Sequence, residues 1–291
     1  MSATTDISLF LKESIDAQIS TLISLTKSKK HAPESLVHEL RKGIKRIRSL
    51  FRLFKPVINE SSFYKTNELI AETGRLLTLQ RESYVNLITF TEIEEQLGDF
   101  LNPDTRELIK DILEKQYKQA YSNDSNYFNN LIFKIAFQLS KIRDSIHSIS
   151  SRSFPYNLLE LAIERDYYKT IHYYNFSKIS LYMEAIHKWR RFCKHFHTHL
   201  KFSPLNQSFD NKQLITDIEN LAEILGKEHD FAVLDLMFSK FCYRNIDLND
   251  RNRLMIYIDK ERNRLRKIAF TTGREIFSKE LVLQPSDIVT V

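Results

Sequence analysis

The feature of this sequence that most constrains its fold is an internal repeat with an offset of about 149 residues. Residues 37–56, VHELRKGIKRIRSLFRLFKP, align with residues 186–205, IHKWRRFCKHFHTHLKFSPL. At an offset of 148, residues 74–87 align with residues 222–235, so the two matches follow each other in the same order. Such a repeat predicts two equivalent halves within one domain. We place the domain at residues 1–291 and its halves at approximately residues 6–150 and 157–283.

Apolar residues in both repeat units recur at the spacing of one helix face. The chain has only 5 Gly and 6 Pro in 291 residues, and no Asn-Gly or Asp-Gly turn joins two strand-like segments. The sequence therefore predicts an all-α fold of helices joined by short loops. The apolar stripes are Val37, Leu40, Ile44, Ile47, Phe51 and Phe54 in the first unit, and Ile186, Trp189, Cys193, Phe196 and Leu200 in the second.

Breaks in this periodicity set the expected helix boundaries. Pro33 suits the start of the second helix and Pro56 its end, while the tail after Leu283 is expected to be loosely held. The expected helices cover residues 6–29, 34–55, 60–79, 82–98, 104–122, 126–150, 157–178, 181–201, 210–226, 229–242 and 249–278.

A row of basic side chains runs beside each apolar stripe. Residues 38–55 carry seven Lys or Arg and one acid, and residues 187–201 carry five Lys or Arg, four His and no acid. Like charges on one helix face repel each other, so an anion must neutralise such a row for the arrangement to be useful. The rows are His38, Arg41, Lys45, Arg48 and Arg52 in the first unit, and His187, Arg190, Lys194, His197 and Lys201 in the second.

The length and chemistry of the rows indicate the kind of anion. The first and last members of each row are 14 positions apart, or roughly 21 Å along the helix, which suits an extended polyanion better than a single phosphate. Arg offers a planar pair of donors to phosphate, and Lys offers a mobile point charge. We expect neighbouring cations to lower the pKa of His38 and His187, leaving both neutral until phosphate binds.

The basic pattern on the first helix, His38, Arg41, Lys45, Arg46, Arg48 and Arg52, resembles the CHAD family, the conserved histidine α-helical domain. The second His187 motif and residues 225–234, LGKEHDFAVL, resemble the second half of that domain, over roughly residues 8–280 in all. Arg81-Glu82 is similar to the first-half counterpart, with Glu in place of Asp. The resemblance implies two four-helix bundles related by a pseudo-twofold axis, with a basic central groove or pore that binds inorganic polyphosphate.

The resemblance also implies a binding module, and we expect that it is not an enzyme and has no cofactor or metal. Other phosphate-rich polyanions are possible partners, and protein partners are unknown. His195 and His197 stand where the family has Arg, and Trp189 and Phe192 replace smaller aliphatic residues. We therefore hypothesise that binding tightens as the pH falls. The implied polyphosphate-binding residues are His38, Arg41, Lys42, Lys45, Arg48, Arg52, Arg81, His187, Arg190, Arg191, Lys194, His197 and Lys201.

Two other functions stay open. His229-Asp230 resembles part of an HD-type metal phosphohydrolase, although the repeat argues that Asp230 instead orients a basic residue, as Glu82 does. RNA or single-stranded nucleic acid would need aromatic rings among the basic residues for base stacking, and the rows contain none. His195 and His199 share a helix face, and we interpret them as a surface pair rather than metal ligands.

The remaining features concern location and lesser sites. Cys193 and Cys242 are too few for a disulfide framework, and no apolar run approaches the length of a membrane span. The first residues have no basic region followed by an apolar run, so we do not expect them to act as a signal peptide. We expect a cytoplasmic protein without membrane contact, and association with polyphosphate granules stays open. Further basic residues that could extend the surface are Arg75, Lys260, Arg264 and Lys267.

Overall fold

The computed structural model describes residues 7–28, 30–121, 125–150, 154–180, 183–203, 209–278 and 281, and no strand occurs in these segments. The fold is all-α, as the sequence predicts. The helices are α1 (Ile7–Lys27), α2 (Pro33–Leu53), α3 (Glu60–Arg75), α4 (Thr78–Leu97), the 3₁₀ helix η1 (Gly98–Phe100), α5 (Pro103–Tyr121), α6 (Ser125–Ser148), α7 (Tyr156–Ile179), α8 (Met183–Lys201), α9 (Phe209–Phe241) and α10 (Leu248–Phe277).

The expected helices differ from the observed ones mainly near Gly226. The sequence predicts a break there, but α9 continues through it. A helical glycine costs about 1 kcal/mol relative to alanine, which is less than the burial of flanking Leu225 and Leu234 contributes. The break between α3 and α4 falls at Leu76 and Leu77, a few residues earlier than expected. The tail beyond Leu283 lies outside the described residues.

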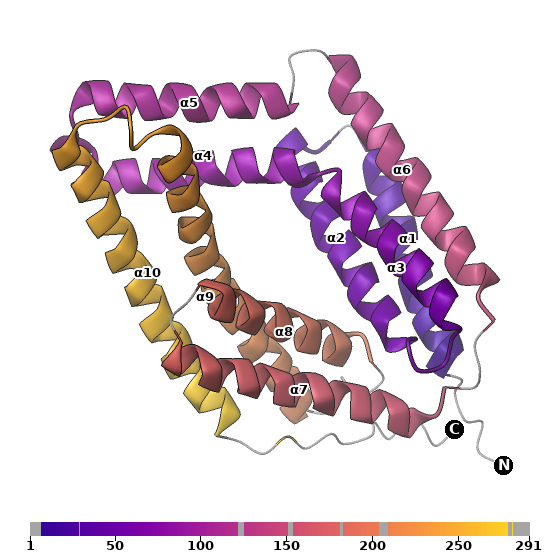
Figure 1. The fold of residues 1–291 in the computed structure, drawn as a ribbon. Helices are drawn as coiled ribbons and strands as arrows, with labels where there is room; N and C mark the ends of the chain where they lie inside the picture. The colour runs from indigo at the N-terminus through magenta and orange to yellow at the C-terminus, as the bar shows by residue number, and fades with distance from the viewer. Residues whose placement is uncertain are drawn as a thin grey trace.

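Two groups of helices surround the larger hydrophobic core. α2 packs against α1 and α3, and α6 closes the group by packing against both α1 and α3. In the second group, α7 packs on α8, α8 on α9, α9 on α10, and α10 returns to α7. Figure 1 shows the first group at the right, with α1 to α3 in indigo and purple and α6 in pink, and the second group at the lower left. The pseudo-twofold relation between them stays a prediction.

A smaller core joins the groups at their far ends. α4 and α5 lie side by side and extend from the first group to α9 and α10 (Figure 1). Phe90 of α4 meets Phe238 of α9 edge to face, with ring centroids 5.9 Å apart. α4 thereby runs from the end of α3 across to the second group, which brings its first turn close to both basic helices.

None of the described helices is long and apolar enough to cross a membrane.

Both predicted apolar stripes are confirmed as core. Every member of the α2 stripe is at most 2% exposed, and every member of the α8 stripe is at most 1% exposed. Because the stripes face the core, the basic rows beside them are held along its edge. The two helices also contact each other directly.

Candidate functional site

The basic residues of α2 and α8 meet those of the first turn of α4. Burial lowers the pKa of Lys45 to about 8, and the charges of Arg41, Arg190 and Arg81 lower it further. Burial likewise lowers the pKa of Lys194 to about 7, helped by Arg190 and Lys45. Such mutual effects require the groups to lie close together. We call this set the central cluster: His38, Arg41, Lys45, Arg81, His187, Arg190 and Lys194.

The electrostatic effects within the central cluster are reciprocal between the halves. The pKa values of His38 and His187 are both lowered, with burial as the largest cause and a neighbouring arginine as the next. Lys194 also lowers the value for His38, and Lys45, its repeat equivalent, lowers that for His187. The expected direction of both shifts is confirmed. Burial contributes most to both shifts, and the neighbouring cations that the sequence predicts as the cause contribute less.

The site is concave on the α2 side. Lys45 and Lys194 are exposed to solvent, yet burial is the main cause of their lowered pKa values. This combination is expected of side chains that reach water while protein surrounds them on several sides. A cavity of about 160 Å³ opens beside Lys45. Its lining consists of Arg41, Ile44, Lys45, Arg48, Ile70, Ala71, Gly74, Arg75 and Thr78.

Neutral acceptors hold the arginines of α2 in place. Arg41 donates from one guanidinium nitrogen to the Gly74 carbonyl oxygen at 3.2 Å and to Thr78 Oγ1 at 2.9 Å. Arg48 donates from Nε to Asn67 Oδ1 at 3.2 Å. Each guanidinium has five N–H donors, so these bonds orient the side chain and leave other donors for an anion. No carboxylate cancels either charge at ion-pair distance among the described residues.

Arg48, Arg52 and Arg191 form what we call the arginine flank of the central cluster. Arg48 and Arg191 both lower the pKa of Arg52, after burial as the largest cause. Arg52 donates to His195 Nε2 at 2.9 Å. A guanidinium has no lone pair to accept with, so the His195 proton lies on Nδ1 and is donated to Ser49 Oγ at 2.8 Å.

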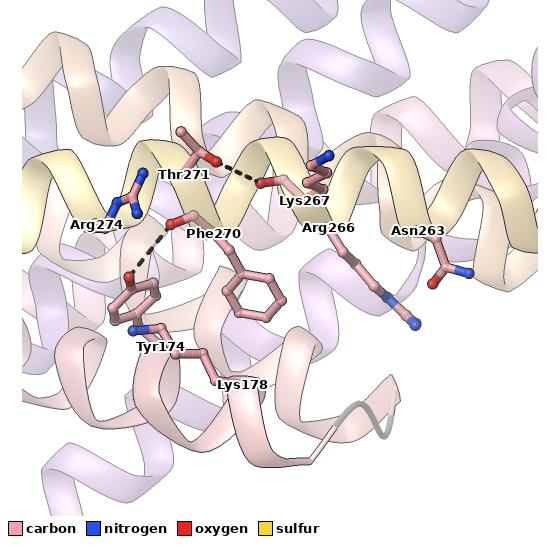
Figure 2. Close-up of a pocket in the computed structure, with 8 residues that line it drawn as sticks. All are labelled: Tyr174, Lys178, Asn263, Arg266, Lys267, Phe270, Thr271 and Arg274. Atoms are coloured by element: carbon pink, nitrogen blue, oxygen red, sulfur yellow. Dashed lines mark hydrogen bonds between the residues drawn. The ribbon is translucent and has the colours of Figure 1, made fainter.

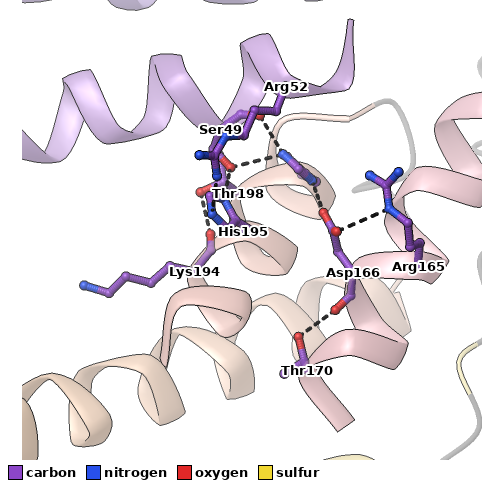
Figure 3. Close-up of polar contacts among 9 residues, drawn as sticks. Ser49, Arg52, Arg165, Asp166, Thr170, Lys194, His195 and Thr198 are labelled. Atoms are coloured by element: carbon purple, nitrogen blue, oxygen red, sulfur yellow. Dashed lines mark hydrogen bonds and ion pairs between the residues drawn. The ribbon is translucent and has the colours of Figure 1, made fainter. Parts of the chain in front are cut away.

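A polar network adjoins this flank, and Figure 3 shows Ser49, Arg52, Asp166 and His195 within it. His199 Nδ1 donates to Asp166 Oδ2 at 2.7 Å, and His199 Nε2 donates to the Ser49 carbonyl oxygen at 2.7 Å. Burial acts to raise the pKa of Asp166, but His199 outweighs it and lowers the value. The interpretation of His195 and His199 as a surface pair is wrong, because His199 is 3% exposed and both rings join α2 to α8.

Lys42, His197 and Lys201 lie on the opposite side, which we call the Glu219 flank. Lys201 Nζ lies 3.3 Å from Glu219 Oε2, and His197 Nε2 lies 3.4 Å from the same oxygen. Although burial acts to raise it, the surrounding basic side chains, Lys42 among them, lower the pKa of Glu219. Two predicted site residues are therefore already engaged by an internal carboxylate. Glu219 lies on a different helix and is not predicted from the spacing of the basic row.

The hypothesis that His195 and His197 sense pH is not supported. Burial is the main cause that lowers the pKa of His195 to about 3 and that of His197 to about 4. Both imidazoles therefore stay neutral from pH 8 to pH 6 without ligand. The pKa values of Lys194 and Lys45 are lowered to about 7 and about 8, so a pH dependence is expected from these lysines.

His229 and Asp230 lie beside the central cluster. The rings of His229 and His187 are 4.9 Å apart, and burial with nearby cations lowers the pKa of His229 to about 3. Asp230 affects Arg190, Lys45 and Lys194 electrostatically, which fits an orienting role. Within the described residues, no group of three or more His, Cys, Asp or Glu could hold a metal ion.

The lesser basic residues lie outside the central cluster. Arg46 donates to Gln18 Oε1 at 2.7 Å, and its charge interacts with that of Glu219 in the Glu219 flank. Arg75 lines the α2 cavity but pairs with Glu68, and Lys267 lines a separate pocket on α10. One aromatic feature was missed by sequence reasoning, because its two rings come from different helices. Phe192, next to Arg191, stacks on Tyr173 with ring centroids 5.0 Å apart.

This geometry places the chain among all-helical proteins that gather basic side chains from two repeat-related helices at one concave site. The chain belongs to the CHAD domain family, whose profile matches residues 13–239. Comparison with curated proteins gives no significant match. The fold is similar to PptA from Streptomyces chartreusis, with a TM-score of 0.68, 11% identity, and coverage of 94% of this chain and 99% of that one. It is also similar to the CHAD domain from the plant Ricinus communis, with a TM-score of 0.64, 14% identity and coverage of 98% and 96%.

Proposed function

We propose that the chain binds inorganic polyphosphate without hydrolysing it, through the central cluster and its two flanks. The observation that carries the proposal is the convergence of both basic rows at one concave site. There Lys45 and Lys194 reach water although burial and like charge lower their pKa values to about 8 and about 7. A polyanion relieves that repulsion along its whole length, which a single phosphate cannot do.

Family membership supports the same ligand, since CHAD domains are expected to bind polyphosphate. The arginine flank extends the central cluster along α2, so the bound chain is expected to follow Arg41, Lys45, Arg48 and Arg52. The Glu219 flank contributes less, because its carboxylate already occupies Lys201.

Binding of long-chain polyphosphate by the Arg41→Ala/Lys45→Ala variant tests this proposal. We expect a loss of roughly 100-fold in affinity, since each charge-assisted contact is worth about 1.5 kcal/mol. The matched control is Lys110→Ala/Lys118→Ala, which removes the same charge from α5, where both lysines pair with glutamates. Circular dichroism should show unchanged helicity in both. Retained affinity in the Arg41 and Lys45 variant would mean that the ligand binds elsewhere.

The non-enzymatic part of the proposal has its own test. The purified chain is analysed for bound metal and assayed for phosphate release from polyphosphate, with and without added divalent cations. We expect no release above background. Metal-dependent release that Asp230→Asn abolishes would overturn this part and favour a hydrolase that uses His229 and Asp230.

Single-stranded nucleic acid is a second candidate because of the stacked pair Tyr173 and Phe192. Lys169 Nζ and Arg191 Cζ lie 5.5 Å and 5.2 Å from the Phe192 ring centroid, so cations and aromatic rings do meet here. Competition between polyphosphate and single-stranded RNA over a salt series separates the two ligands. If RNA is the ligand, Phe192→Leu weakens RNA binding and leaves polyphosphate binding unchanged.

A further inference from the structure

A second basic depression lies between α7 and α10, apart from the site described above. Its volume is about 480 Å³, within the range of small-molecule sites. Figure 2 shows side chains of both helices around it, with Phe270 between α10 and α7. The residues that matter here are Tyr174 and Lys178 from α7, and Arg266, Lys267, Phe270 and Arg274 from α10.

The charge of this depression is strongly one-sided. Four of its lining residues are basic, and none of the residues that line it is acidic. Lys267 and Arg274 form no ion pair within the described residues, and Lys178 lies with Nζ 3.8 Å from the centroid of the Tyr174 ring. Three cations thus reach the depression without a carboxylate at ion-pair distance.

The fourth cation, Arg266, is paired with a carboxylate, but that carboxylate does not neutralise it fully. Arg266 lies 2.7 Å from Glu228 Oε1, but Arg262 Nε lies 3.1 Å from the same oxygen. One buried carboxylate therefore serves two guanidinium groups, which leaves one positive charge in excess. Three cations without a carboxylate and one that shares its carboxylate together favour a ligand with three or four negative charges.

The floor of the depression is rigid. Tyr174 donates to the Phe270 carbonyl oxygen at 3.4 Å, and Phe270 stacks on Trp189 with ring centroids 5.3 Å apart. Trp189 is fully buried, so the floor is fixed by the core. A preformed floor lowers the ordering cost of binding a compact ligand.

We propose that this depression, the α7–α10 site, binds a compact phosphate compound with three or more negative charges. An inorganic oligophosphate and a nucleotide share that chemistry. The site stands apart from the proposed polyphosphate function, since Lys267 and Arg274 belong to neither row nor flank. Arg and Lys together provide forked and point-charge contacts to phosphate oxygens.

Calorimetric titration of the full chain with tripolyphosphate, and separately with ATP, tests the α7–α10 site. Lys267→Ala/Arg274→Ala is expected to weaken binding of the preferred ligand at least tenfold while long-chain polyphosphate binding is retained. The matched control, Lys260→Ala/Arg264→Ala, removes the same charge from α10 outside the depression and should leave the affinity unchanged. Tighter binding of ATP assigns a nucleotide, and tighter binding of tripolyphosphate assigns an inorganic ligand.

The Arg41→Ala/Lys45→Ala variant distinguishes this inference from the proposed function. If it alone abolishes binding of both compact ligands, they bind the central cluster and the α7–α10 site is refuted. The α7–α10 site is also refuted if the wild-type protein binds neither tripolyphosphate nor ATP at millimolar concentration. Loss of long-chain binding in that variant, with compact ligands still bound, supports both proposals at once.

Discussion

The two flanks of the central cluster are equivalent by sequence and different in charge. At the repeat offset of 149, Arg48, Arg52 and Arg191 correspond to His197, Lys201 and Lys42. In the arginine flank, Arg52 is held by a neutral imidazole and Arg48 by an amide oxygen. In the Glu219 flank, Lys201 is held by a carboxylate, and His197 is neutral.

The comparison shows that a basic side chain can be held in position either by a neutral acceptor or by a carboxylate that neutralises its charge. A neutral acceptor fixes a guanidinium and leaves its charge for a ligand, whereas a carboxylate fixes an ammonium and neutralises it. Glu219 corresponds at the offset of 148 to Ala71, which lines the open α2 cavity. The equivalent positions therefore carry an uncharged alanine beside the arginine flank and a negatively charged glutamate beside Lys201.

The largest expected effect comes from removing the buried support of the arginine flank. Asp166→Ala leaves His199 without its carboxylate in the core, and we expect a loss of about 3 kcal/mol in the free energy of unfolding. That corresponds to a fall of roughly 6 to 10 °C in Tm. Thermal unfolding followed by circular dichroism measures it.

The control for this prediction is Asp16→Ala, which breaks a surface contact with Arg143 and His147. Solvent screens that contact, so its loss should cost about 0.5 kcal/mol or less. Equal losses in the two variants would contradict a supporting role for the Asp166 network.

Much of the fold is predicted by the helical periodicity of the sequence, and much of the candidate site is predicted by the internal repeat. The stripe from Val37 to Phe54 identified the buried face of α2 because a helix repeats its face every three to four residues. The basic rows followed for the same reason. Glu219 was missed because its meeting with Lys201 depends on how α8 and α9 pack, which local spacing does not encode.

Other features also depended on through-space contacts. His195 and His199 share a helix face, which suggested a surface pair, but Ser49 and Asp166 come from other helices and bury them. The lowered pKa of Lys45 needs burial as well as charge, and burial is not visible in charge spacing. The continuity of α9 through Gly226 was missed because a helix-breaking residue was given more weight than its packing.

The next largest effect is the loss of polyphosphate affinity on truncating each flank, which allows the two flanks to be compared directly. Arg48→Ala/Arg52→Ala should weaken polyphosphate binding roughly 100-fold, since two uncompensated charge contacts are lost at about 1.5 kcal/mol each. The equivalent His197→Ala/Lys201→Ala should weaken it only about threefold, because Glu219 already occupies Lys201. Titration calorimetry measures both. Equal losses would mean that the flanks do not differ in function.

A smaller effect concerns the lysine pair that the halves share. Lys194 and Lys45, with pKa values lowered to about 7 and about 8, are charged at pH 6 and neutral at pH 9 without ligand. Affinity for polyphosphate should therefore fall about tenfold between these values as the pH rises. Lys45→Arg/Lys194→Arg keeps both charges and should bind with little pH dependence. A wild-type profile as flat as that of the variant would contradict the assignment.

The smallest expected effect removes the difference between the flanks. Glu219→Gln keeps the size of the side chain and removes the negative charge beside Lys201, so polyphosphate should bind about threefold more tightly. Glu223→Gln is the matched control, because Glu223 is exposed one turn further along α9 and forms no ion pair within the described residues. Both variants remove one negative charge, so a general electrostatic effect would tighten binding equally in both. Tighter binding in Glu219→Gln alone would show that the carboxylate specifically suppresses one flank, and the further loss on adding Lys201→Ala would then approach that of Arg52→Ala.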